Sequence, residues 1–530
     1  MCGIAAVVGY SNEIRARRDL SKIMGIISHR GESRFQNEAW SGSQVALACN
    51  RLPFTSGDDE NQPVVSPSGR YRVVLNGEIY AFHSRSRGGQ KSDTALLAAM
   101  IENQGIRSIS ELDGIFAIIV VDTQRNRVYV ARDYFGIKPL YYSYVRPNNS
   151  LRSGVYFSSE VKGLSGFSEF AEIHEVAPGE LLSFDRGSSK LVDRIERKPM
   201  PRLSFCDEEE RVAALASALD MAVRDQTADQ DEYALLLSGG VDSSGLLALA
   251  QQDSRVRLRA FVIGREDSTD LLGAKEVAKL LGIELVKVVA PSESTLFARL
   301  HEIVKSVESF EPNVVRQSAV SDVLCRRVAA QGLRVGLCGE GADELFCGYP
   351  EFSVANDPMR LRKRFINDLR RTQLQRVDRT SMAHTIEMRV PFLSRRVAEV
   401  ALSIDECSSY LQNGENRKNK IIFRKAIERK TNLPMKTVMK EKVVLSEGAG
   451  YLGNDPGVGL FSSLAERAVS DDEFMSVKRD HMEYSLDTKL EVFLFKQFKS
   501  LGYTKLSSAK RRIVANSVNS LAGKSIGVAV

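Results

Sequence analysis

The sequence lacks the features that mark membrane, secreted and zinc-binding proteins. Its longest apolar run, Ile115 to Val121, is far shorter than the roughly 20 residues of a membrane-spanning helix. No basic stretch leads into an apolar core at the N-terminus, so no signal peptide is expected. The seven cysteines are odd in number and contain no Cys-x-x-Cys pair, which argues against a disulfide framework and against a zinc site. We therefore expect a cytoplasmic protein without a membrane segment.

A large excess of charge of one sign is also missing. The 530 residues carry a formal net charge of +6, with 43% hydrophobic and 26% charged residues, which is the composition of an ordinary globular protein. A chain of this length is too long for one hydrophobic core, so two or three domains are expected. The segment from Thr504 to Val530 has no acidic residue, and a solvated basic tail is favoured there over a nucleic-acid-binding one.

The common P-loop, Gly-x-x-x-x-Gly-Lys-Ser/Thr, is absent, yet another stretch has the character of a phosphate site. Leu235 to Leu237 predict a buried strand and Ser243 to Gln252 predict a helix. Glycines between them let the backbone approach a ligand, and the helix N–H groups point at an anion. Hydroxyls there can donate to phosphate oxygens, whereas Asp242 implies a cation, most simply Mg²⁺. The residues concerned are Ser238, Gly239, Gly240, Asp242, Ser243 and Ser244. A tight turn that merely needs glycine is the alternative.

With its aspartate and serine pair, this stretch resembles the pyrophosphate loop of the ATP-pyrophosphatases. Members of that family split ATP into AMP and pyrophosphate in order to activate a substrate. The resemblance implies that ATP is a substrate of this chain and that Mg²⁺ accompanies it.

A cysteine stands at the second position of the chain. Because Cys is small, the initiator Met should be removable, and the α-amine of Cys2, with an ordinary pKa of roughly 8, could then act as the base for its own thiol. An early cysteine alone is usually incidental. Four further motifs follow in order: Ser28 to Gly31, Asn50 to Leu52, Leu75 to Tyr80, and Ser92-Asp93. Together the five resemble the class II glutamine amidotransferase domain, which uses an N-terminal cysteine.

The resemblance implies roles for these residues. Asn76 and Gly77 would form the oxyanion hole for the tetrahedral intermediate on glutamine, although the same pair between two apolar stretches also predicts a hairpin turn. Arg51, with Leu52 beside it, suits the glutamine α-carboxylate, and Asp93 with Glu78 suits its α-ammonium. Taken singly, an Arg or Asp would more simply form a surface ion pair.

The first domain is expected to be an α+β, antiparallel-sheet domain of the Ntn type over residues 2–195. Ile115 to Val121 and Val128 to Ala131 predict a hairpin joined by a polar turn, and Val155 to Ser158 and Leu181 to Asp185 predict further strands. The stretch from Arg194 to Asp207, rich in Arg, Lys and Pro, suits a linker.

The second domain, residues 205–505, is expected to be an α/β domain with a parallel sheet and a helical C-terminal part. A helix begins at Glu208, and strands then alternate with helices at Leu235 to Leu237, Leu258 to Ile263, Glu284 to Val288 and Arg334 to Leu337. Ser268 is expected to cap one of the helices, with Gly282 just past its end. Ligands of such sheets bind at the carboxyl ends of the strands. The role of the basic tail, residues 506–530, cannot be predicted.

A loop at the end of the fourth strand, Cys338 to Phe346, combines glycines with carboxylates. By itself it could be an acidic turn. It also resembles the Ser-Gly-Glu-Gly-Ser-Asp-Glu motif of asparagine synthetases. The resemblance implies that Asp343 joins Asp242 in holding Mg²⁺, that Glu340 is an acid/base group near the acyl carbon, and that Lys442 contacts the phosphates and the intermediate. It further places the adenosine beside Leu237, Ile263, Cys338 and Gly339.

The resemblance to this family, over roughly residues 2 to 500, implies glutamine-dependent asparagine synthesis. Cys2 would release ammonia from glutamine, while the second domain converts ATP and aspartate into β-aspartyl-AMP and pyrophosphate. Aspartate is expected to fit because Glu340, Arg389 and Lys442 leave charged groups for it. Three alternatives stay open: an amidotransferase for another carboxylate, an amide-forming cyclase, and a binding protein without catalysis. Relatives are often dimers, which implies a possible homodimer.

Overall fold

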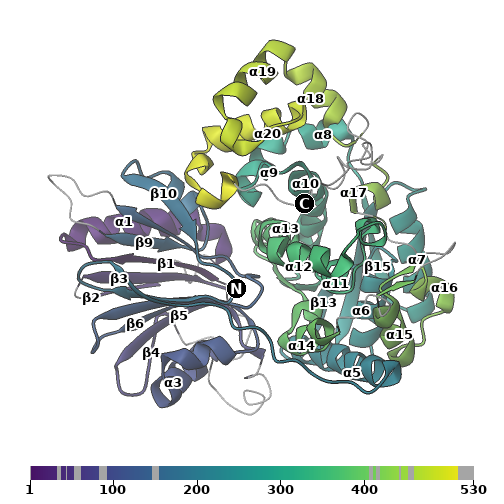
Figure 1. Ribbon diagram of the computed structural model, residues 1–530, viewed down its shortest axis with the longest axis horizontal. Helices are drawn as coiled ribbons and strands as arrows, with labels where there is room; N and C mark the ends of the chain where they lie inside the picture. The colour runs from purple at the N-terminus through teal and green to yellow at the C-terminus, as the bar shows by residue number, and fades with distance from the viewer. Residues whose placement is uncertain are drawn as a thin grey trace. The chain divides into compact units, whose positions relative to one another are not determined.

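The computed structural model describes residues 2–32, 38–42, 44–52, 61–80, 82, 92–145, 154–404, 410–412, 418–440, 443, 445–451 and 459–510. The chain folds into two compact units (Figure 1). Unit 1 consists of Met1–Pro199, Met382–Thr385 and Lys496–Arg511, and unit 2 of the remainder. In this described part of the chain, no helix is both long and apolar enough to cross a membrane.

Unit 1 is built on two antiparallel sheets of six strands each. The first has the order β10 (Phe170–Glu175), β8 (Tyr141–Val145), β9 (Val155–Ser158), β1 (Cys2–Val8), β3 (Val45–Arg51), β2 (Glu38–Gly42). The second has the order β12 (Leu191–Ile195), β11 (Leu181–Asp185), β7 (Arg127–Arg132), β6 (Ile115–Asp122), β5 (Tyr71–Glu78), β4 (Val64–Val65). Helix α1 (Glu13–Ile26) packs on the first sheet and α3 (Asp93–Gln104) on the second, as the layers of Figure 1 show. The predicted antiparallel Ntn-type fold is confirmed.

The layered packing explains the longest apolar run of the sequence. Ala117 and Ile119 of β6 belong to the core between the two sheets, whereas Phe116 and Ile118 belong to the core under α3. Because β6 is covered on both faces, it needs apolar side chains at every position rather than at alternate ones. The predicted hairpin is also confirmed, since β6 and β7 pair in antiparallel register.

The hairpin turn predicted at Asn76-Gly77 is wrong. Both residues lie inside β5, where Asn76 pairs with Ala117 and Gly77 with Phe116. The glycine is needed for a different reason: its φ is +137°, and a Cβ there would lie 1.8 Å from the carbonyl oxygen of Ile115. The close approach of β5 and β6, and not a turn, therefore requires glycine at position 77.

The prediction of a solvated basic tail is wrong for its first residues. The 3-10 turns η9 (Tyr503–Lys505) and η10 (Ser507–Lys510) pack on unit 1, and Tyr503 is buried. Lys505 Nζ donates to the carbonyl oxygens of Ser165, at 3.3 Å, and Phe167, at 2.7 Å, and Leu506 forms a bridge with Ile173 of β10. The edge strand β10 offers backbone groups that a neighbouring segment can bind. Residues 511–530 lie outside the described part.

Unit 2 has a five-stranded parallel sheet with the order β15 (Glu284–Val289), β14 (Arg257–Gly264), β13 (Glu232–Leu236), β16 (Val335–Leu337), β17 (Glu387–Arg389). The predicted α/β class and its first four strands are confirmed. The short fifth strand was not predicted. The main helices around the sheet are α5 (Glu208–Gln226), α6 (Val241–Ala250), α7 (Thr269–Leu281) and α10 (Pro312–Ala330).

Two helix starts refine the predictions. Helix α6 begins at Val241, two residues before the predicted start, and its N-cap is Gly240, without a side-chain hydrogen bond. Ser268 does occupy the N-cap position of α7 and Gly282 the C-cap, with a left-handed φ of +66°, but the Ser268 hydroxyl makes no capping bond. The start of α6 and the end of α7 thus both lie at glycines, and neither helix start is capped by a serine hydroxyl.

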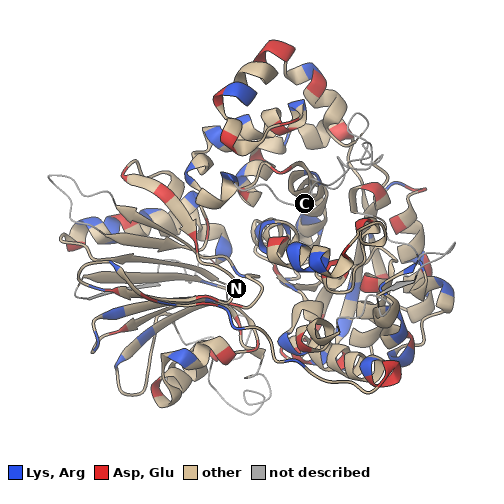
Figure 2. Ribbon diagram, viewed as in Figure 1, with Lys and Arg blue, Asp and Glu red and all other residues tan. Residues whose placement is uncertain are grey.

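The other α-helices and strands are short or belong to the helical C-terminal part. They are α4 (Lys162–Ser165), α8 (Glu293–Phe297), α9 (Leu300–Val307), α11 (Ala342–Leu345), α12 (Pro358–Asp368), α13 (Gln373–Met382), α14 (Arg395–Ser403), α15 (Ile421–Lys430), α16 (Met435–Val438), α17 (Leu445–Gly448), α18 (Ser462–Ala468), α19 (Asp471–Asp480), α20 (Lys489–Ser500) and the strand pair β18 (Leu411–Gln412) and β19 (Lys418–Asn419). Basic and acidic residues are interspersed along the helices drawn in Figure 2, in keeping with the mild net charge.

Candidate active sites

The first candidate site surrounds Cys2, the first residue of β1. Its side chain is only 4% exposed and belongs to the core between the two sheets of unit 1. The backbone nitrogen of Cys2 donates to Asn76 Oδ1 at 3.0 Å, and Gln62 Nε2 donates to the Cys2 sulfur at 3.9 Å. Across the strand pair, Cys2 stands opposite Arg51. The fold thus brings three predicted residues, Cys2, Asn76 and Arg51, into one place.

The thiol of Cys2 is activated by its surroundings. The pKa of Cys2 is lowered to about 6, and a hydrogen bond with the Cys49 side chain is the largest cause. Burial opposes this shift, whereas the positive chain terminus, the Leu52 backbone and Arg51 add to it. Cys49 lies on β3, two residues before Arg51, and so on the same face of the sheet as Cys2. Because the thiolate is the nucleophilic form, a lowered pKa favours Cys2 as a nucleophile at neutral pH.

The side-chain amide of Asn76 has a donor atom, Nδ2, that no acceptor among the described residues binds. Its side chain is completely buried, and its Oδ1 is taken by the Cys2 nitrogen. Its Nδ2 has no hydrogen-bond partner within the described residues. An orphan donor buried in this way costs about 1–3 kcal/mol. A donor held next to a nucleophilic thiol is what an oxyanion needs.

Charged groups of both signs are buried around this site. Arg51 is 5% exposed, Glu78 5% and Asp93 6%, with the apolar Leu52 beside Arg51. Glu78 ends β5, two residues after Asn76, and Asp93 reaches the same end of that strand because its Oδ2 accepts a hydrogen bond from Ile79 N at 2.7 Å. One buried cation and two buried carboxylates suit a small zwitterion.

A buried ion cluster lies beneath the nucleophile strand. Arg30 donates from Nε to the Cys2 carbonyl oxygen at 3.3 Å and pairs with Glu160 at 2.6 Å. His29 and Lys162 also reach Glu160, at 2.9 and 2.6 Å. Although burial opposes ionisation, His29, Lys162 and Arg30 hold the pKa of Glu160 well below its ordinary value. The cluster holds the backbone of Cys2 in place and gives Glu160 a role that the sequence did not reveal.

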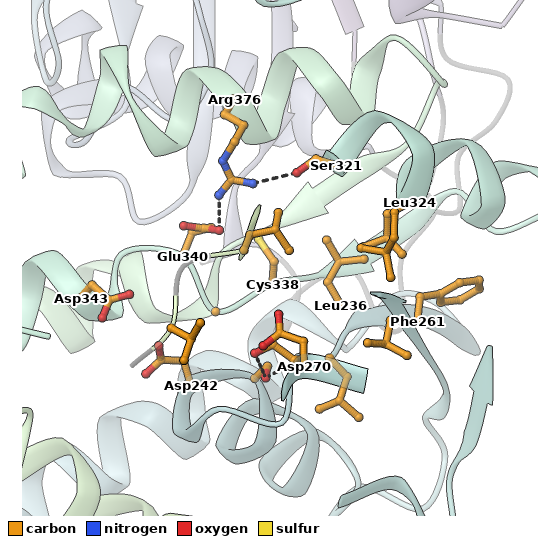
Figure 3. Close-up of a pocket in the computed structure, with 18 residues that line it drawn as sticks. Leu236, Asp242, Phe261, Asp270, Ser321, Leu324, Cys338, Glu340, Asp343 and Arg376 are labelled. Carbon is orange, nitrogen blue, oxygen red and sulfur yellow. Dashed lines mark hydrogen bonds and ion pairs between the residues drawn. The ribbon is translucent and has the colours of Figure 1, made fainter. Parts of the chain in front are cut away.

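The second candidate site is a cavity in unit 2 at the carboxyl ends of β13, β14 and β16 (Figure 3). One wall is apolar, with Leu236, Phe261, Val262 and Leu324. Nine predicted residues line the cavity: Leu237, Ser238, Asp242, Ser243, Ile263, Cys338, Gly339, Glu340 and Asp343. An apolar wall beside strand ends and a helix N-terminus suits a nucleotide, with the base on the wall and the phosphates at the helix.

The other predicted residues of the glycine loop support the cavity from behind. Gly239 has a φ of +72°, and a Cβ there would lie 2.3 Å from the backbone of Gly273 in α7, so only glycine fits. Gly240 caps α6. Ser244 is completely buried within α6 and does not line the cavity.

Lys420 occupies the point where the two predicted metal ligands meet. This side chain is 1% exposed, and its Nζ lies 2.7 Å from both carboxylate oxygens of Asp242 and 2.6 Å from Asp343 Oδ1. Lys420 precedes α15 in a left-handed conformation, with a φ of +59°. The ammonium group of Lys420 thus bridges the two carboxylates beside the loop that precedes α6.

Glu340 is held by a residue that the sequence did not single out. Arg376, on α13, pairs with Glu340 Oε1 and donates to Ser321 Oγ at 3.0 Å (Figure 3). Burial opposes the charge of Arg376, but Glu340 keeps the pKa of this guanidinium above its ordinary value. A carboxylate and a guanidinium at the cavity wall can bind a small charged substrate.

One predicted substrate contact is wrong and another cannot be placed. Arg389 is completely buried, and its guanidinium is held by Glu387 at 2.7 Å and Asp229 at 2.6 Å, so it faces the interior of the domain and not the cavity. Arg376 supplies the cavity cation instead. Lys442 lies outside the described residues.

Besides Cys49 and Glu160, four site residues were missed from the sequence: Gln62, Asp270, Arg376 and Lys420. Asp270, in the first turn of α7, lines the cavity. None of the four stands in a glycine-rich or other phosphate-binding pattern, and each is brought to its site by long-range folding.

Comparisons with known proteins agree with this division of the chain. A family model described as a glutamine amidotransferase domain matches residues 1–195, and one described as asparagine synthase matches residues 214–365 and 354–471. The chain is 30% identical over 502 residues to a glutamine-hydrolysing asparagine synthetase of Brassica oleracea, a match that covers 90% of this chain and 82% of the relative. It is 28% identical to a probable glutamine-hydrolysing asparagine synthetase of Schizosaccharomyces pombe, with 94% and 92% covered.

Proposed function

Because the chain belongs to the family of glutamine-hydrolysing asparagine synthetases, we propose that it makes asparagine from aspartate, using ATP and ammonia taken from glutamine. The observation that carries the proposal is the orphan donor of Asn76 beside the activated thiol of Cys2 in unit 1, together with the cavity at the phosphate loop in unit 2. In terms of domains, we assign glutamine hydrolysis to residues 2–195 and the ATP-dependent step to residues 205–505.

Glutamine hydrolysis begins at Cys2 once Met1 has been removed. The α-amine, held by Asn76 Oδ1, takes the proton of the thiol, and the sulfur attacks the side-chain carbonyl carbon of glutamine. Asn76 Nδ2 and the N–H of Gly77 bind the oxyanion that forms. The α-ammonium then gives its proton to the departing nitrogen, and collapse of the intermediate expels ammonia and leaves a thioester. Water hydrolyses the thioester to glutamate and restores the thiol. Arg51 binds the α-carboxylate of glutamine, with Leu52 beside it, and Asp93 and Glu78 bind its α-ammonium.

The ATP-dependent step takes place at the loop before α6. The N–H groups at the start of α6 and the hydroxyl groups of Ser238 and Ser243 bind phosphate oxygens, and Lys420 neutralises part of their charge. Leu237, Ile263, Cys338 and Gly339 flank the adenosine, and Gly239, Gly240 and Ser244 shape the loop. The β-carboxylate of aspartate attacks the α-phosphate, which gives β-aspartyl-AMP and releases pyrophosphate.

Mg²⁺ bound together with ATP is part of the proposal. Magnesium is commonly held by one or two carboxylates and by substrate phosphates. Asp242 and Asp343 provide two carboxylates that converge on one point, at Lys420 Nζ. Groups of three or more His, Cys, Asp or Glu that could hold a metal without phosphates are absent from the described residues. When bound, the ion would supply charge neutralisation for the departing pyrophosphate.

The acceptor is placed by Glu340 and Arg376. The guanidinium of Arg376 suits the α-carboxylate of aspartate, and Glu340 suits either its ammonium or the proton of the attacking ammonia. Lys442 is assigned to the phosphates and the intermediate. A cytoplasmic location suits the reactive thiol of Cys2, and a homodimer is proposed from the family resemblance.

The first test separates the two reactions. Cys2→Ala should abolish asparagine formation from glutamine and leave formation from ammonium intact, because the thiol chemistry and the ATP chemistry lie in different units. Cys206→Ala, which changes an exposed cysteine, is the matched control and should leave both reactions unchanged. Equal loss with both nitrogen sources in Cys2→Ala would contradict the division.

The second test identifies the acceptor. The enzyme is incubated with ATP, Mg²⁺, ammonium and one carboxylate at a time, and AMP and the amide product are measured. Asparagine and AMP in equal amounts with aspartate support the proposal. Turnover of another carboxylate, with no AMP from aspartate, would assign the chain to a related amidotransferase or cyclase activity.

A further inference from the structure

The side chain of Gln62 connects the nucleophile of unit 1 to the strand that carries Asn76. It is only 6% exposed. Its Oε1 accepts a hydrogen bond from Leu75 N at 2.7 Å, and its Nε2 lies 3.9 Å from the sulfur of Cys2. Leu75 is the residue immediately before Asn76 in β5.

The bond to Leu75 fixes which end of the amide faces the sulfur. A backbone N–H can only donate, so the atom of Gln62 that faces it must be the carbonyl oxygen. The NH₂ group of the same amide is therefore turned toward Cys2 and cannot be exchanged for the oxygen by a flip without losing the bond to Leu75. The bond to Leu75 N thus leaves an N–H group of Gln62 facing the sulfur of Cys2.

We propose that Gln62 is a further catalytic residue of glutamine hydrolysis, whose amide N–H donates to the sulfur of Cys2 whenever that sulfur carries negative charge. This inference rests on the proposed glutaminase activity of unit 1. Sulfur is charged twice in the reaction, first as the attacking thiolate and again as the leaving group when water adds to the thioester and the carbon–sulfur bond breaks, its electron pair returning to sulfur. A donor stabilises both of these states more than the uncharged thioester between them.

A neutral amide suits this task better than a cation. Arg51 and the amino terminus already favour the thiolate, and the Cys49 thiol lies beside it. A further positive charge next to the sulfur would repel the ammonium group of glutamine, whereas an amide adds a donor without adding charge. Because Gln62 also holds the backbone at Leu75, the donor and the neighbouring oxyanion residue Asn76 keep a fixed spacing.

The experiment measures the sulfur directly as well as the reaction. Cys2 is alkylated with iodoacetamide over a range of pH in the absence of glutamine, and the modified peptide is quantified by mass. The variants are Gln62→Met, which removes the amide at similar volume, and Gln62→Glu, which keeps the acceptor for Leu75 N but puts a carboxylate beside the sulfur. Gln124→Met, at an exposed turn between β6 and β7, is the matched control.

In Gln62→Met the midpoint of alkylation should rise by about one pH unit, and the rate at pH 6 should fall roughly fivefold, as expected for the loss of one hydrogen bond to a charged group. The kcat/KM for glutamine should fall at least as much, while ammonium-dependent synthesis stays at the level of wild type. Gln62→Glu should raise the midpoint further, and Gln124→Met should change nothing.

Two outcomes separate this inference from the proposed function. Reduced glutaminase activity in both Gln62 variants with unchanged alkylation midpoints would overturn the inference, because a purely structural role would act in that way. A wild-type protein without glutaminase activity would instead overturn the proposed function, and the alkylation midpoints would still report whether Gln62 acts on the sulfur.

Discussion

Replacing Lys420 by methionine tests the charge arrangement at the phosphate loop most directly. The ammonium group of Lys420 is the cation that lies between Asp242 and Asp343. Methionine fills a similar volume without charge, so the variant leaves two buried carboxylates facing one another. We expect the stability of unit 2 to fall and its response to Mg²⁺ to change.

The size of the effect follows from the distances. Asp242 Oδ2 lies 2.7 Å and Asp343 Oδ1 2.6 Å from the same nitrogen, so the two oxygens are at most about 5.3 Å apart. At an effective dielectric constant of about 20, two unit charges at that distance repel by roughly 3 kcal/mol. This agrees with the ~3–5 kcal/mol that removing one partner of a buried ion pair commonly costs. Both carboxylates are at least 86% buried by side chain, so solvent screens the repulsion little.

The measurement is urea-induced unfolding of wild type and variants with and without Mg²⁺, in the absence of nucleotide. Mg²⁺ should stabilise Lys420→Met strongly, because the ion can replace the lost ammonium, and should stabilise wild type far less. Lys425→Met is the control on α15: Lys425 pairs with Glu208 at the surface, where such pairs contribute ~0–1 kcal/mol. Equal stability of Lys420→Met and Lys425→Met, or equal stabilisation of wild type and Lys420→Met by Mg²⁺, would refute the reasoning.

Three further outcomes are expected. The kcat/KM for glutamine should fall about tenfold per pH unit below about pH 6, since the pKa of Cys2 is lowered to about 6 and only the thiolate attacks; a pH profile with glutamine beside one with ammonium checks this. Asp343→Asn should remove ATP-dependent pyrophosphate release and spare glutaminase activity, which coupled assays on the same sample can measure. Arg389→Met should lower the free energy of unfolding of unit 2, measured in urea, by about 3–5 kcal/mol, because it removes the guanidinium that pairs with the buried carboxylates of Asp229 and Glu387. An unchanged midpoint of urea-induced unfolding would contradict this.

The parts of the fold and sites that the sequence predicts well are local in the chain. The loop from Ser238 to Ser243 needs glycines, hydroxyls and a helix start within a few residues, so its chemistry can be predicted before its surroundings are known. The run from Ile115 to Val121 likewise predicts a buried strand, since only a strand covered on both faces tolerates so many consecutive apolar residues.

The parts that could not be predicted depend on pairing between distant segments. Lys420 meets Asp242 across 178 residues of chain, and no pattern around Lys420 reveals a left-handed residue whose side chain points into a phosphate site. Asn76-Gly77 has the composition of a turn, but its environment is set by the neighbouring strand β6. The sequence predicts a substrate contact for Arg389 because this residue is charged. Its buried partners, Asp229 and Glu387, can be recognised only in the folded domain.

The packing of residues 496–510 against the rest of unit 1 also has a consequence for synthesis on the ribosome. The unit that holds Cys2 is largely made by Pro199, but its last segment emerges about 300 residues later, which corresponds to tens of seconds at roughly 5–20 residues per second. During that interval the edge of β10 lacks Leu506 and the Lys505 contacts at Ser165 and Phe167. An uncovered edge strand is where nascent chains associate with one another. The glutaminase unit thus reaches its final form only when nearly the whole chain has been translated, so a truncated product carries an incomplete first unit as well as a missing end.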